Sequence, residues 1–247
     1  MSNKFSFKRF NQVLAYDWKR FIRNFGITLL VWISMPVMFW VTSLVFDFEL
    51  RVEFREVIIF GLIAITVMSA PSRIYGKVNL PREGVSFGML PATNLEKFIS
   101  MFLYCSVLTP VLTVLGSWLV DCLMTLLPFG GFIEYIPLWD ALSGVTFGEA
   151  VAMIVALIAI VLAESSIFMF GNMIFKRRKT GKTFGWILLI KFTLGLLLQL
   201  TNGWRLADWV FKDGNSIANL WIFTAITMVI ACGFYYGTYR KIKTQKY

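Results

Sequence analysis

The chain has 247 residues, of which 57% are hydrophobic and only 15% are charged, and its mean hydropathy is +0.70. A soluble protein of this length carries far more charge, so the composition excludes an ordinary soluble domain. The net charge is +10, and the chain contains no histidine, which removes the commonest general base and metal ligand.

The first segment, residues 1–25, carries an amphipathic pattern. Apolar residues recur every three or four positions at Phe10, Leu14, Trp18, Phe21 and Phe25. Lys8, Gln12, Lys19 and Arg23 fall on the opposite side of the helical wheel, with Asp17 and Asn24 at the edge of the apolar stripe. This spacing predicts a helix that lies in the inner membrane interface. A helix packed on a partner protein is the alternative.

Six apolar stretches follow, and each meets the length of about 17 to 25 residues that crosses the hydrocarbon core. They are residues 26–46, 57–75, 98–127, 150–175, 184–202 and 218–238. The connections between them are mostly too short for a soluble domain. We therefore predict an all-α integral membrane protein, with one domain over residues 1–247 and six transmembrane helices after the interfacial helix.

The basic residues predict the orientation of these spans. The segments before the first span, between the second and third, between the fourth and fifth, and after the sixth hold 19 of the 24 Lys and Arg residues. The loop at 128–149 holds none. The positive-inside rule then places both termini in the cytoplasm. The net charge is interpreted as orienting the spans and facing anionic lipid, and nucleic-acid binding is not expected.

The loop at 76–97 is the longest of the predicted cytoplasmic connections, and Pro81 and Pro91 with several glycines divide it into short pieces. It ends in Thr93-Asn94-Leu95-Glu96, which matches a capping box. In this motif the Thr93 side chain accepts from the Glu96 N–H, while the Glu96 side chain accepts from the Thr93 N–H. By itself the motif indicates only where the third span begins.

The wider string from Met89 to Phe98 reads MLPATNLEKF. It resembles a segment of permease subunits of ABC type-2 exporters, particularly compact bacterial ones, in which a Leu-Pro-Ala-Ser/Thr turn precedes Glu-Lys-Phe. The layout of the whole chain is also similar: an interfacial helix, six spans, cytoplasmic termini and a basic tail that includes Arg240, Lys241 and Lys243.

The resemblance implies a membrane subunit of an ATP-driven exporter in the bacterial cytoplasmic membrane. Two copies, or this chain and a similar permease, would form the translocation path as a dimer. The loop at 76–97 would help to dock a separate ABC-type ATPase, with these residues near the partner: Leu90, Pro91, Thr93, Asn94, Glu96 and Lys97. The substrate and the direction of transport do not follow from the residues.

ATP would be bound by the partner subunit, and no cofactor is expected on this chain. The string Thr180-Gly181-Lys182-Thr183 lacks the first glycine of a phosphate-binding loop, because Lys176 occupies that position. The competing hypothesis is a non-transporting six-span scaffold or immunity-type protein. An intramembrane enzyme is less favoured, because the spans contain no paired Asp and only one Lys.

Two ionisable residues stand inside the predicted spans. Glu164 lies near the middle of the fourth span and Lys191 in the inner half of the fifth. An intramembrane charge costs about 2.5 to 3.5 kcal/mol on insertion scales, so each needs a partner or water. Counting residues from the cytoplasmic end of each span places the two side chains within reach of each other, which predicts an ion pair between adjacent spans. The alternatives are that the two residues line the translocation path or that the Lys191 side chain snorkels to the interface. Asp121, in the outer part of the third span, is expected to lie near water.

Overall fold

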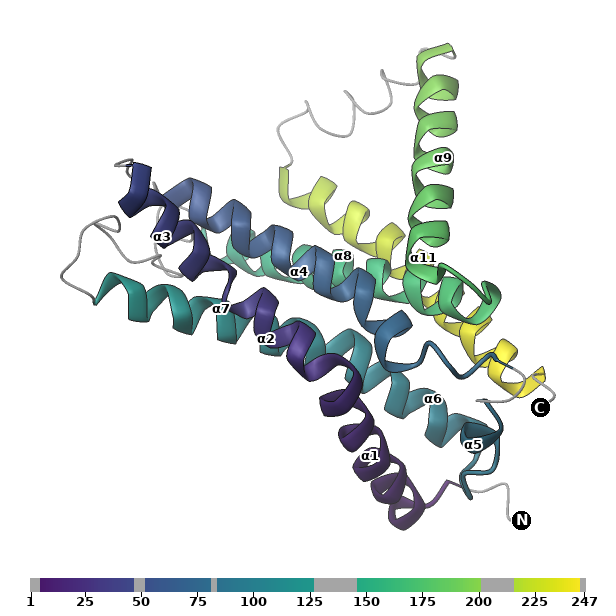
Figure 1. The fold of residues 1–247 in the computed structure, drawn as a ribbon. Helices are drawn as coiled ribbons and strands as arrows, with labels where there is room; N and C mark the ends of the chain where they lie inside the picture. Colours follow the sequence, from purple (N-terminus) through teal and green to yellow (C-terminus); the bar gives the residue numbers. More distant parts are fainter. Residues whose placement is uncertain (1–4, 47–51, 81–83, 127–145, 201–215, 245–247) are drawn as a thin grey trace.

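The computed structural model describes residues 5–46, 52–80, 84–126, 146–200 and 216–244, and the regular structure in these ranges is helical (Figure 1). The helices from the first half of the chain are α1 (Phe7–Phe21), the π-helical turn η1 (Ile22–Gly26), α2 (Ile27–Ile33), α3 (Met35–Phe46), α4 (Val52–Ile74), α5 (Val85–Gly88), α6 (Asn94–Phe102), the π-helical turn η2 (Leu103–Leu108) and α7 (Thr109–Thr125). They are followed by α8 (Phe147–Ile174), α9 (Lys179–Leu200) and α11 (Ser216–Thr244).

Five helical stretches of the described residues are long and apolar enough to cross a membrane. They are Phe7–Phe46, Phe54–Ile74, Asn94–Thr125, Phe147–Ile174 and Ile217–Thr244. The predicted span at 184–202 begins within α9 and extends beyond the described residues. Five candidate spans are thus present, and the sixth span remains a prediction.

The outward faces of these helices are apolar. Large hydrophobic side chains are exposed on α2, α3, α4, α7, α8, α9 and α11, whereas soluble monomers rarely expose large contiguous apolar patches. Inside the bundle, α4 packs against α7 and α8, and α8 packs against α11. The largest buried side chains include Phe25, Tyr75, Phe87, Met101 and Met169, which belong to one core cluster. This distribution is the one expected of a membrane protein.

The sequence predicts that an interfacial helix ends and a first span begins at residue 25, but the helical structure continues through this position. α1 continues into α2 through η1, and Phe21 and Phe25 are buried, with the Phe21 ring in contact with both Phe25 and Tyr104. The apolar face of α1 is therefore covered partly by α6 and by Tyr104 of η2 in the same chain. The membrane interface remains a predicted location for the exposed face, which includes Trp18.

Two interruptions of the long helices accompany proline residues. α2 ends at Ile33 and α3 begins at Met35, directly before Pro36. Pro110 follows η2, where the N–H of Thr109 donates to the carbonyl of Tyr104 in the wider π pattern. A proline cannot donate a backbone hydrogen bond and its ring crowds the preceding turn, so a break or a widened turn accommodates it.

Three helical segments from different parts of the chain lie at the same end of the bundle. The start of α1, the short helix α5 and the end of α11 are at one end of the bundle, opposite the ends of α3 and α7 (Figure 1). The Phe98 and Tyr239 rings, on α6 and α11, have centroids 5.8 Å apart in an edge-on contact. Which side of the membrane this end faces remains a prediction.

Candidate functional site

The loop before α6 contains the capping box that the motif predicts. The Thr93 side chain accepts from the Glu96 N–H at 3.3 Å, and the Glu96 carboxylate accepts from the Thr93 N–H at 2.8 Å. Two backbone donors that a helix start leaves free are thereby satisfied. The chain direction into the span that starts with α6 is fixed at this point.

Glu96 also holds the beginning of the chain against this loop. Its Oε1 accepts from the Ser6 backbone N–H at 2.8 Å and from the Arg9 guanidinium at 3.2 Å, and the residue is 0% exposed. One carboxylate therefore joins the start of α1 to the start of α6. Because Glu96 is fully buried, it presents no exposed surface to a partner and acts as a support within the protein.

Lys97 is buried as well, with 5% of its surface exposed. Its ammonium group donates to the Gly88 carbonyl at 3.0 Å and lies 5.4 Å from the centroid of the Phe87 ring. Leu90 packs against the core cluster, where it is half-buried. These two side chains hold α5 and the following turn against the bundle.

Four other side chains of the string face outward. Met89 is 78% exposed and Leu95 is 43% exposed, and Pro91 and Asn94 are also exposed. The six residues predicted for docking thus divide into supports within the protein and an outer surface. We call the four residues Met89, Pro91, Asn94 and Leu95 the outer loop face. Met89 and Leu95 were not among the predicted residues, although their place in an exposed turn could have indicated them.

A buried polar cluster lies between α1, α6 and Tyr75, the residue that directly follows α4. Asp17 is 0% exposed, and its Oδ2 accepts from the Tyr75 hydroxyl at 2.9 Å and from the Ser100 hydroxyl at 2.5 Å. The Arg20 guanidinium lies 5.3 Å from the centroid of the Tyr75 ring. The position of Asp17 at the edge of the apolar stripe gave only a weak signal of this burial. The cluster connects three helices at the end of the bundle that holds the loop.

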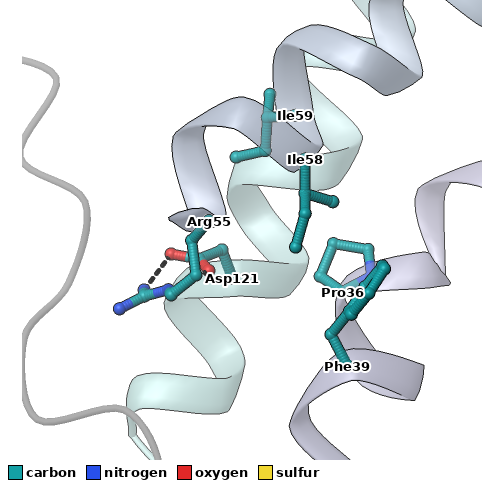
Figure 2. Close-up of a pocket in the computed structure, with 6 residues that line it drawn as sticks. All are labelled: Pro36, Phe39, Arg55, Ile58, Ile59 and Asp121. Atoms are coloured by element: carbon teal, nitrogen blue, oxygen red, sulfur yellow. Dashed lines mark hydrogen bonds and ion pairs between the residues drawn. The ribbon is translucent and has the colours of Figure 1, made fainter. Parts of the chain in front are cut away.

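A second buried ionic contact joins α4 to α7. Arg55 Nε donates to Asp121 Oδ1 at 2.9 Å and its Nη2 donates to Oδ2, with 3% and 1% of the two residues exposed. Figure 2 shows the pair facing each other beside Ile58 and Ile59 of α4 and Pro36 and Phe39 of α3. The expectation that Asp121 lies near water is wrong, because its carboxylate is enclosed by the helices and paired with an arginine. Arg55 lies in α4 rather than in a loop, because the helix begins five residues before the predicted span.

Glu164 and Lys191 do not form the predicted close ion pair. No contact within 4 Å joins them, although the structure describes both side chains. Glu164 is half-buried in α8, and Lys191 is exposed on α9, so the charge of Lys191 acts on Glu164 only across a longer distance. The physical reason is that α9 runs away from the other helices (Figure 1), so a small difference in depth along the two helices does not bring the side chains together.

No family model, no curated protein and no solved structure matches this chain.

Proposed function

We propose that this chain is the membrane subunit of an ATP-driven exporter and that it docks a separate ABC-type ATPase through the outer loop face. The observation that carries the proposal is the string Met89–Phe98, which resembles the corresponding segment of ABC type-2 permeases. The exposure of the outer loop face beside buried neighbours supports it, because a docking surface needs accessible side chains on a rigid support. The bacterial cytoplasmic membrane is the proposed location.

The supports of the loop give a route by which a docked ATPase would move the membrane helices. Glu96 links the loop to Arg9 and the start of α1, and Asp17 links α1 to α4 and α6 through the Tyr75 and Ser100 hydroxyls. α6 itself continues through η2 into α7. A displacement of the outer loop face would therefore act on α1, α4 and α7 together.

A second copy, or a similar permease, would complete the path. The side chains of α9 are exposed around most of the helix from Phe184 to Thr193, and Lys191 is among them. An intramembrane ammonium group needs a partner or water, and Glu164 of the same chain is not in contact with it. A dimer that meets at α9 would supply both the apolar cover and a polar path.

The test is the yield of the ATPase that purifies with the tagged chain from native membranes. Asn94→Trp places a bulky side chain on the outer loop face, so it should reduce the co-purified ATPase by at least about tenfold, which corresponds to about 1.4 kcal/mol of binding free energy. Val45→Trp, at an exposed position on α3 at the other end of the bundle, is the matched control and should change nothing.

The helix cap provides a second comparison. Thr93→Ser keeps the side-chain acceptor and should bind the ATPase normally, whereas Thr93→Ala should cost about 1 kcal/mol of local stability and weaken docking. A chain that purifies without any ATPase in every context, before and after these changes, would favour the non-transporting scaffold.

A further inference from the structure

An open hollow lies where the end of α4 meets the turn between α8 and α9. It has a volume of about 530 Å³ and is lined by these residues: Asn24, Ser72, Arg73, Gly76, Lys77, Lys176, Arg178, Lys179, Thr180 and Gly181. Half of these residues are basic and none is acidic. Neither the capping box nor the outer loop face belongs to it.

One of the basic residues that line the hollow, Lys179, is buried and held in a fixed position. Lys179 is 8% exposed, and its ammonium group donates to the Gly76 carbonyl and to the Asn79 side-chain oxygen. The Asn79 amide in turn donates to the carbonyls of Asn172 and Phe175 at 3.0 Å each. These contacts connect the segment after α4 to the end of α8. The lysine is therefore held in place by the backbone around it.

The rim carries four further basic residues, and all four are exposed: Arg73, Lys77, Lys176 and Arg178. The hydroxyls of Ser72 and Thr180 lie 2.6 Å apart and join α4 to the first turn of α9. α9 begins at Lys179, so the free backbone N–H groups of its first turn add positive potential on the same side. Like charges around one hollow repel one another, and an anion between them would relieve this repulsion.

We propose that this hollow binds a phosphate group, presented by the headgroup of an anionic phospholipid or by a soluble phosphate compound. The lipid source is favoured by the exposed apolar side chains of Ile174, Phe184 and Trp186, which flank the turn on α8 and α9 and would contact the acyl chains. If these basic residues served only to orient the spans in the membrane, exposed side chains would be enough. That role would not require an enclosed lysine whose ammonium group is held by two acceptors. The proposal stands independently of ATPase docking.

The experiment measures binding to the purified full-length protein in detergent. The probes are dioctanoyl phosphatidylglycerol, dioctanoyl phosphatidylcholine and soluble glycerol 1-phosphate. The test variant is Arg73→Gln with Lys176→Gln, which removes two rim charges and leaves Lys179 in place. The control variant is Lys241→Gln with Lys243→Gln, which removes the same charge from exposed positions near the end of α11.

Phosphatidylglycerol should bind more tightly than phosphatidylcholine, and the test variant should weaken it by about fivefold for each charge, or about 30-fold in total. The control variant should bind as the unmodified protein does. Binding of glycerol 1-phosphate with the same loss in the test variant would assign the site to a soluble phosphate. Equal losses in the two variants, or no preference for any phosphate-bearing anion, would overturn the proposal. Unchanged midpoints of thermal unfolding in both variants would show that a loss of binding does not come from a loss of fold.

Discussion

The Arg55–Asp121 pair should make a large and coupled contribution to stability. Both groups are buried, and two hydrogen bonds join them. Removing one partner, by Asp121→Leu or Arg55→Met, leaves the other charge buried without compensation and should cost about 3–5 kcal/mol. For a chain of this size each kcal/mol lowers the midpoint of thermal unfolding by about 2–4 °C, so each single variant should unfold about 6–20 °C lower. Arg55 makes a further interaction of its own, so its variant should lose more.

A double-mutant cycle isolates the pair from that further interaction. Arg55→Met with Asp121→Leu removes both charges, so it should recover most of the loss and give a coupling energy of about 3 kcal/mol or more. The assay is reversible unfolding in mixed micelles, followed by tryptophan fluorescence. The matched control is Glu164→Gln with Lys191→Met, which should couple by less than about 1 kcal/mol because these side chains are not in contact. Additive losses at Arg55 and Asp121 would refute the reasoning.

Three further predictions concern packing, the loop and pH. Gly171→Ala would place a methyl group 2.1 Å from Thr183 Oγ1, so it should lower the free energy of unfolding by about 1–3 kcal/mol, whereas Gly233→Ala meets no atom within 4 Å and should be neutral or stabilising in the same assay. Glu96→Ala, which removes the acceptor of three donors, should cost about 1.5–3 kcal/mol, and Glu96→Gln should cost less because it keeps the cap; equal losses would contradict this. Burial lowers the pKa of Lys179, which precedes the predicted span, to about 8. The affinity for phosphatidylglycerol should therefore fall as pH rises from 7 to 9, and a flat profile would exclude this lysine from the site. Since the unfolded chain holds this proton more tightly, the free energy of unfolding should rise from about pH 8 towards 10.5.

The sequence predicted the features that depend on local order along the chain. Apolar stretches of membrane length appear as long helices, because the pattern and the composition act within each helix. The capping box at Thr93 and Glu96 is present for the same reason, since both its contacts lie within three residues. The exposed position of Asn94 follows from its place in the first turn of α6.

The interactions between distant residues could not be obtained in this way. The partner of Asp121 lies 66 positions earlier in the chain, and apolar windows that start at residue 57 leave Arg55 in a loop. The burial of Asp17 depends on which helices cover α1 and not on its own periodicity. The pairing of Glu164 with Lys191 assumed that adjacent antiparallel spans pack side by side, whereas α9 departs from α8 (Figure 1). Each of these outcomes depends on how the helices pack together, and this packing cannot be read from a single sequence.

Photocrosslinking from the outer loop face tests the proposed function most directly. A photoreactive amino acid at Asn94 in native membranes should crosslink to a protein that carries a phosphate-binding loop and hydrolyses ATP. The same amino acid at Val45, exposed at the other end of the bundle, should not. An ATPase captured from position 94 alone is the predicted result. Crosslinks from position 94 only to lipid, or only to proteins that hydrolyse no ATP, would contradict the proposal.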